Sequence, residues 1–114
     1  MPEPEAVCEP DEHEGDLRLD LRSPAVADAA EIFRTLADPA RLRTLVLLAE
    51  GECCVGDLAS KLGERMTTVS QRLRLLRSAR LVSGRRAGKH VFYRLQDEHV
   101  MQLIRNAIEH ASEH

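Results

Sequence analysis

The chain has 114 residues, enough for one domain with a real hydrophobic core and too few for two independent domains. Aromatic residues make up only 3% of it, so the core must be built from aliphatic side chains, which favours a mainly helical fold. No apolar run is long enough to cross a membrane, and three cysteines make a poor disulfide framework, so we expect a soluble protein of the reducing cytoplasm.

The formal net charge of −3 hides a strong asymmetry along the chain. Residues 1–22 carry eight acidic side chains against two arginines and show no apolar period, which predicts a mobile acidic tail followed by one domain over residues 23–114. Residues 65–94 carry nine arginines or lysines and no acid. A basic block of this density is typical of a surface that binds nucleic-acid phosphates, although a merely solvated basic face has the same composition.

Three helices are predicted in the first half of the domain. The first spans residues 24–37, where apolar side chains recur at helical spacing after an N-terminal proline. The second spans residues 39–50, preceded by Asp38 as its N-cap and ended by a glycine. A short third helix over residues 55–62 is also closed by a glycine.

A fourth helix follows, and its two faces differ. Val69, Leu73 and Leu76 form one apolar stripe, and Thr67 is expected to cap the helix. The opposite side carries hydroxyl, amide and guanidinium groups, which suit DNA bases and phosphates: Thr67, Ser70, Gln71, Arg74 and Ser78, with Thr68 nearby. With the preceding short helix and turn, this pattern is typical of a helix-turn-helix whose second helix enters the major groove.

After this helix the apolar period changes from 3.6 to 2. Two extended runs, residues 81–86 and 90–95, are separated by the turn Ala87-Gly88-Lys89 and predict a β-hairpin. Basic side chains crowd its tip, namely Arg85, Arg86, Lys89 and His90. A basic hairpin at this place is typical of a wing that reaches the DNA backbone, although ordinary solvated strand ends would look the same. The expected fold class is mainly α with a small β-hairpin, a winged helix-turn-helix.

The order of these elements resembles the ArsR/SmtB family of winged-helix metal-sensing repressors. So do the segments "FRTLADPARLRTLVLLAEGECCVGDLA" and "TTVSQRLRLLRSARLVSGRRAGKHVFYRLQDEHV". The resemblance covers roughly residues 24–113. It implies a homodimer, with the N- and C-terminal helices at the dimer interface, that occupies an inverted repeat in double-stranded operator DNA. It also implies that an effector metal ion lowers the affinity for DNA and releases transcription of metal efflux or sequestration genes.

The last predicted helix carries candidate metal ligands at both ends. Asp97 and His99 lie at its start and His110 and Glu113 at its end. This spacing resembles that of the terminal ligand set of the family and matches it without a gap. The 11 residues from one histidine to the other span about 16 Å of helix, whereas two imidazoles on one zinc ion must bring their nitrogens within about 3.5 Å. One helix therefore cannot close the site, but two antiparallel copies across a two-fold axis can.

The donor atoms of this inter-subunit site indicate the metal. Two oxygen and two nitrogen ligands in a closed tetrahedron predict zinc, with cobalt as a surrogate. The paired helices also need an apolar seam, which is expected from Val100, Leu103, Ile104, Ala107, Ile108 and Ala111.

A second metal site involves the cysteines. The resemblance implies a ligand at Cys54, paired with Cys8 and His13 of the tail, in a thiolate-rich site for cadmium, lead, zinc or copper(I). Cys53 stands where the family usually has leucine, so it is either a further thiolate or a small core residue.

Three functional classes follow from these features. A zinc-responsive transcriptional repressor is expected. The alternative on the same fold is a thiol-based repressor that senses redox state, reactive sulfur, cadmium or lead through Cys8, Cys53 and Cys54. An enzyme is the least favoured class, because four protein ligands leave no open position on zinc for water, and no nucleophile with a paired base is visible.

Overall fold

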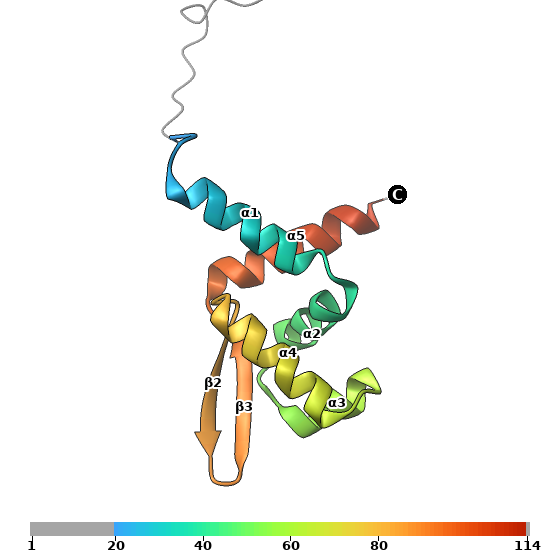
Figure 1. Cartoon of the computed structure of the whole chain (residues 1–114). Helices are drawn as coiled ribbons and strands as arrows, with labels where there is room; N and C mark the ends of the chain where they lie inside the picture. Colours follow the sequence, from blue (N-terminus) through green and yellow to red (C-terminus); the bar gives the residue numbers. More distant parts are fainter. Residues whose placement is uncertain (1–19, 114) are drawn as a thin grey trace, which may run out of the picture.

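Five helices and three strands make up residues 20–113, the part of the chain that the computed structural model describes. Their order is α1 Pro24–Leu36, α2 Pro39–Glu50, β1 Cys53–Cys54, α3 Val55–Leu62, α4 Met66–Ser78, β2 Val82–Ala87, β3 His90–Leu95 and α5 Glu98–Ser112 (Figure 1). The mainly helical winged helix-turn-helix is thereby confirmed. None of these helices is long and apolar enough to cross a membrane. The expected tail, with Cys8 and His13, falls almost wholly outside the described residues, and its boundary stays a prediction.

Local caps fix most of the helix ends. Asp38 accepts a hydrogen bond from the backbone N–H of Arg41 at 3.0 Å, which starts α2 as predicted. Gly63 ends α3 in the left-handed conformation, with φ 66°. The prediction that Thr67 caps α4 is wrong. The N-cap is Arg65, which has an extended backbone and a side chain that makes no capping hydrogen bond. Thr67 already lies inside the first helical turn.

The wing is a three-stranded antiparallel sheet in the order β1-β3-β2. The hairpin register runs from Val82 opposite Leu95 to Ala87 opposite His90. The expected turn Ala87-Gly88-Lys89 is therefore corrected, because Ala87 belongs to β2 and only two residues turn, with Gly88 at a positive φ of 61°. Strand β1 was not predicted from the sequence.

The core lies where α2, α3, α4, α5 and the base of the sheet meet. It contains the predicted α4 stripe, and its largest wholly buried side chains include Leu45, Leu48, Leu58, Leu73, Leu76, Leu81 and Ile104. In contrast, α1 buries no residue. It lies with α5 at one end of the molecule, and α3 and the tip of the hairpin lie at the other (Figure 1). The terminal helices α1 and α5 are therefore separated along the molecule from α3 and the tip of the basic hairpin (Figure 1).

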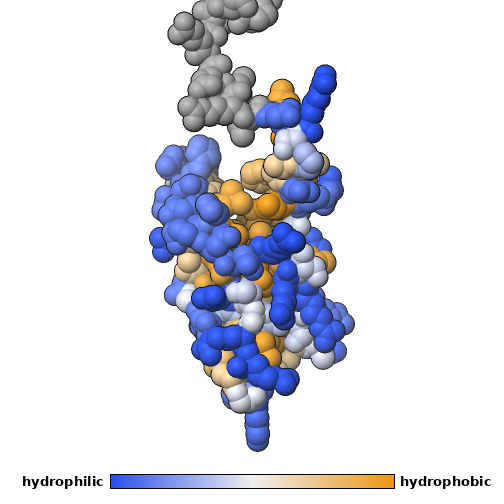
Figure 2. Space-filling model, turned by 90° about the vertical axis from the view of Figure 1, so that its left-hand side faces the viewer, coloured by the Kyte–Doolittle hydropathy of each residue, from blue (hydrophilic) through white to orange (hydrophobic). Residues whose placement is uncertain are grey.

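The predicted apolar seam of α5 is divided between two environments. Val100 and Ile104 belong to the core of the same chain, whereas Ile108 remains 40% exposed. Val26 and Phe33 of α1 are 46% and 60% exposed. Hydrophobic residues accordingly reach the surface at the height of α1 and α5 in Figure 2, between hydrophilic neighbours.

Candidate metal sites and nucleic-acid interface

The start of α5 brings the first two predicted ligands together. Asp97 is the N-cap, and its Oδ1 atom accepts a hydrogen bond from the backbone N–H of Val100 at 3.0 Å. The extended cap backbone turns the carboxylate toward His99, whose Nδ1 lies 3.8 Å from the same oxygen. The His99 side chain is fully exposed. One imidazole and one carboxylate thus face the surrounding space side by side.

The end of α5 repeats this arrangement with the other two ligands. Nδ1 of His110 lies 3.8 Å from Oε2 of Glu113, as expected for residues three apart on a helix. The two side chains are 90% and 73% exposed. Within residues 20–113 no three His, Cys, Asp or Glu side chains gather closely enough to hold a metal ion. Each end therefore supplies two possible metal donors, one imidazole and one carboxylate.

The two described cysteines differ in accessibility. Cys53 lies opposite Tyr93 in the sheet and is only 9% exposed, and its burial raises the pKa of the thiol. A buried thiol with a raised pKa is a poor source of thiolate, so Cys53 fits the core better than a metal site. Cys54 is half-buried at the N-cap of α3, where its side chain makes no cap bond. Its expected partners Cys8 and His13 lie outside the described residues.

Helix α4 presents the predicted DNA-reading side chains outward. Thr67, Thr68, Gln71, Arg74 and Ser78 are exposed and Ser70 is half-buried, whereas the apolar stripe on the opposite side is fully buried. Gln and Arg can form paired hydrogen bonds with base edges, and hydroxyl groups suit phosphate oxygens. This face has the chemistry of a DNA-recognition helix.

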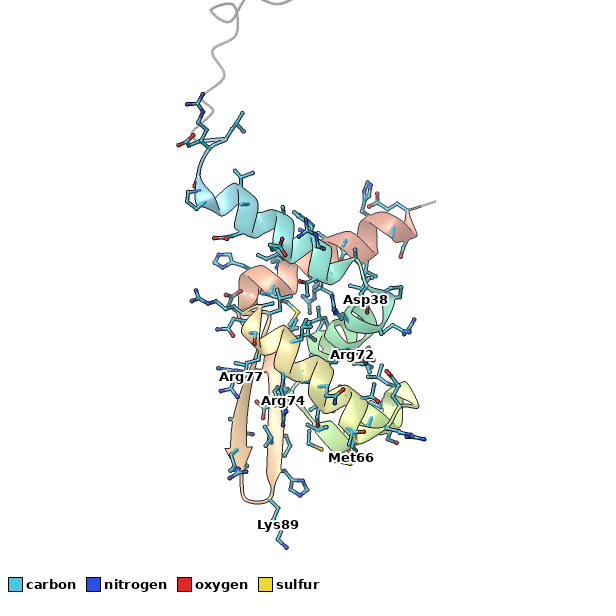
Figure 3. The ribbon with its side chains drawn as sticks, in the orientation of Figure 1. Asp38, Met66, Arg72, Arg74, Arg77 and Lys89 are labelled. Atoms are coloured by element: carbon cyan, nitrogen blue, oxygen red, sulfur yellow. The ribbon has the colours of Figure 1, made fainter. Side chains whose placement is uncertain are left out.

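One arginine of the basic block points inward instead. Arg72 donates from Nη1 and Nη2 to the two carboxylate oxygens of Glu64, at 2.8 and 2.6 Å, and from Nη1 to the hydroxyl of buried Thr44 at 3.1 Å. Figure 3 shows it between α4 and α2. Its hydrogen bonds and charge hold the pKa of Glu64 below the usual value. Arg72 thus ties α4 to the turn between α3 and α4 through Glu64, and to α2 through Thr44. Position 72 borders the apolar stripe of α4, and this was the one signal in the sequence that could have indicated its inward orientation.

The basic residues of the wing also fall into two groups, paired and unpaired. All four predicted basic residues are exposed, but Arg85 is paired with Glu52, which sequence reasoning missed, whereas Arg86 and Lys89 form no ion pair with an acid of the described residues. Lys89 projects from the tip of the hairpin, away from the helices (Figure 3). The predicted basic residues are therefore gathered on the hairpin, but they are not equivalent.

Comparison with known proteins agrees with this architecture. A family model described as bacterial regulatory protein, arsR family, matches residues 38–83, from the N-cap of α2 into β2. The transcriptional repressor SmtB homolog of Synechocystis is 50% identical over 84 residues, which are 74% of this chain and 64% of that protein. This chain therefore spans less than two thirds of that repressor.

Two further proteins extend the match over more of the chain. The cadmium resistance transcriptional regulatory protein CadC homolog of Staphylococcus aureus is 40% identical over 97 residues, which cover 84% of this chain and 80% of that protein. A homodimeric winged helix-turn-helix DNA-binding domain from Mycobacterium bovis, described as a possible ArsR-family transcriptional regulator, has a TM-score of 0.76 and 35% identity. That likeness covers 85% of this chain and 90% of the other.

Proposed function

The chain belongs to the ArsR/SmtB family of winged-helix transcriptional repressors, and we propose that it binds operator DNA as a homodimer and is released by zinc. The observation that carries the proposal is the division of ligands on α5. Asp97 and His99 form one half-set and His110 and Glu113 the other, each with its two side chains 3.8 Å apart. Only a second chain can bring the two halves together, because one α5 holds them at its opposite ends.

Unpartnered apolar surface supports the dimer. Val26 and Phe33 of α1 and Ile108 of α5 are large apolar side chains left exposed in the single chain. Ile108 also borders an open hollow of about 430 Å³, lined mainly by Leu42, Val46, Leu47 and Leu62. Exposed apolar side chains beside an apolar hollow are typical of a protein–protein interface. An antiparallel pairing of α5 helices would cover them and would place both half-sets at each end.

Zinc fits the donor set best among common metals. Two imidazole nitrogens and two carboxylate oxygens suit a tetrahedral ion, with cobalt as a spectroscopic surrogate. Bound zinc would fasten the start of one α5 to the end of its partner and so favour one arrangement of the dimer. By this reasoning zinc acts as effector and needs no open coordination position.

The operator contacts come from α4 and the wing. We assign base contacts to Gln71 and Arg74, with Thr67, Thr68 and Ser70 near phosphates or base edges. At the wing, Arg86, Lys89 and His90 are placed to meet the backbone. The family and the fold are those of DNA-binding transcriptional regulators rather than enzymes.

Titration of the purified dimer with zinc, cobalt and cadmium tests the proposal, with binding to its own promoter DNA as the readout. Zinc should weaken binding to the promoter, and cobalt should follow it with a tetrahedral spectrum. Promoter binding that stays the same at saturating zinc would exclude zinc as the effector. Release by cadmium alone would favour the cysteine site.

Replacing Gln71 with Ala should reduce operator preference at one base pair by about 1–3 kcal/mol, the usual value of a good paired contact to a base. Binding to random DNA should change little, because phosphate contacts supply most of it. Competition between operator and point-mutated duplexes measures the difference. Gln102→Ala, the same chemical change at an exposed glutamine of α5 outside the DNA-reading face of α4, is the control. A uniform loss on all duplexes would assign Gln71 to the backbone instead.

The alternative, a repressor regulated through thiols, is favoured by one observation: Cys54 is accessible at the start of α3. If this site binds cadmium, Cys54→Ser should abolish the thiolate-to-metal absorption band and Cys8→Ser should weaken it. Cys53→Ser is the matched comparison and should leave the band in place, because the Cys53 side chain is buried. Loss of all metal-dependent DNA release in the Cys54 variant, with the α5 ligands intact, would put the thiol function first.

A further inference from the structure

One arginine of the wing is held by a carboxylate from outside the hairpin. Arg85 lies in β2, yet its Nε and Nη2 atoms are 2.7 and 2.5 Å from Oε1 of Glu52, which precedes β1. Because the strand order is β1-β3-β2, the side chain must cross β3 to reach that carboxylate. It crosses over Phe92, its cross-strand partner, with the guanidinium carbon 5.0 Å from the ring centroid. Arg85 and Glu52 therefore tie the two edges of the sheet together.

The neighbouring basic residues of the wing differ from Arg85 in having no acidic partner within residues 20–113. These residues, Arg86 and Lys89, are exposed. Successive residues of a strand point to opposite faces, so Arg86 lies on the other face of the sheet from Arg85. The hydrogen bond from Arg85 to Glu52 raises the pKa of the guanidinium above its already high usual value. The positive charge of Arg85 is thus matched locally by the carboxylate of Glu52.

We propose that Glu52 is a determinant of DNA affinity, and that it acts by withdrawing Arg85 from the set of phosphate contacts. The inference rests on the proposed function, in which the wing lies along the DNA backbone. A free guanidinium that binds phosphate releases condensed counterions, whereas one already neutralised by a carboxylate releases few. Exchange of partners would also leave the Glu52 carboxylate unpaired beside phosphates of like charge. Arg85 then serves as a brace across the sheet, and Arg86 and Lys89 supply the positive charge.

The salt dependence of binding to a random-sequence duplex tests this assignment. Arg86→Ala should lower the slope of log affinity against log salt by about 1.8, which is about 0.9 for each wing of a dimer. Arg85→Ala should lower it by less than half that amount. Glu52→Gln can still accept a hydrogen bond from Arg85 but removes the charge. It should steepen the slope by about 1 to 2, so its gain in affinity shrinks about 4- to 16-fold between roughly 50 and 200 mM salt.

Glu50→Gln is the matched control, because Glu50 is an exposed carboxylate close by in sequence that forms no ion pair within residues 20–113. Equal slopes for Arg85→Ala and Arg86→Ala, or equal effects of the two Gln substitutions, would overturn the inference. The random duplex separates this test from that of the proposed function, since promoter preference does not enter the slope. Slopes as expected, with no preference for the promoter, would count against the proposed function alone.

Discussion

Replacing Leu73 with Ala is expected to lower the free energy of unfolding by about 2–5 kcal/mol, the usual cost of this truncation in a packed core. The Leu73 side chain is 0% exposed, in the stripe of α4 that also contains Val69 and Leu76. Truncation would remove its packing contacts and leave a cavity behind the recognition helix. The loss is large because the whole stability of such a domain is about 5–15 kcal/mol. Denaturant unfolding at a fixed chain concentration measures it, since dimerisation adds to apparent stability.

Leu75→Ala is the matched control for this prediction. It makes the same chemical change two residues away, on the same helix, at a side chain that is 42% exposed. Leu75 borders an open hollow beside Ile32 of α1, so little packing is lost when it is shortened. We expect a change below about 1 kcal/mol, as for most exposed positions. A loss equal to that of Leu73→Ala would mean that both sides of α4 are packed, contrary to the structure.

The sequence was a good guide to several features that depend on near neighbours, although the cap of α4 and the exact hairpin turn were not among them. Asp38 and Asp97 cap helices by bonding a backbone N–H only three residues away, so both helix starts could be predicted from residue type and spacing. The buried stripe of α4 follows from the helical period in the same way. The pairing of ligands at each end of α5 is also local, because it joins residues two or three positions apart.

Features that depend on distant segments could not be predicted. Strand β1 has only two residues, too few for a period, and it exists because β3 lies beside it. The partner of Arg85 is 33 residues away, at Glu52, and nothing in the local pattern distinguishes this arginine from Arg86. The hydrogen bond of Arg72 to Thr44 of α2, 28 residues away, is likewise absent from the local pattern, although the position of Arg72 beside the apolar stripe is visible in it.

The seam of α5 illustrates the same limit on a single helix. A helical period gives the apolar face but not the identity of what covers it. Val100 and Ile104 pack into their own chain, and Ile108 is left for another partner. The part of the seam open to a second chain is therefore shorter than the sequence predicted, and α1 supplies additional exposed apolar surface through Val26 and Phe33.

Replacing either His99 or His110 with Ala should abolish tight zinc binding at both sites of the dimer. In the proposed inter-subunit site each zinc ion takes one imidazole from each end of α5, so either change would remove one ligand from every site. The loss should exceed the roughly 10- to 100-fold effect of residues that only orient metal ligands. Zinc titration against a competing chelator measures it. His90→Ala, a histidine change on the wing, is the control and should leave zinc affinity unchanged.

Both variants should still bind operator DNA as dimers, because the apolar surfaces of α1 and α5 and the face of α4 are untouched. They should no longer release DNA with zinc. In the wild type, release requires that zinc binding and DNA binding oppose each other, and linkage makes the effect reciprocal, with a usual coupling of about 1–3 kcal/mol. Zinc affinity should therefore be about 5- to 150-fold weaker when operator DNA is bound.

A heterodimer of the His99→Ala and His110→Ala chains gives the decisive comparison. One of its sites lacks both histidines, while the other regains Asp97 and His99 from the His110→Ala chain and His110 and Glu113 from the His99→Ala chain. One zinc ion should bind tightly and restore part of the response to zinc. This recovery can occur only if the ligands of one site come from two chains, since neither parent chain holds both imidazoles. Failure to bind zinc in the heterodimer, or tight tetrahedral binding in either parent, would contradict the inter-subunit site.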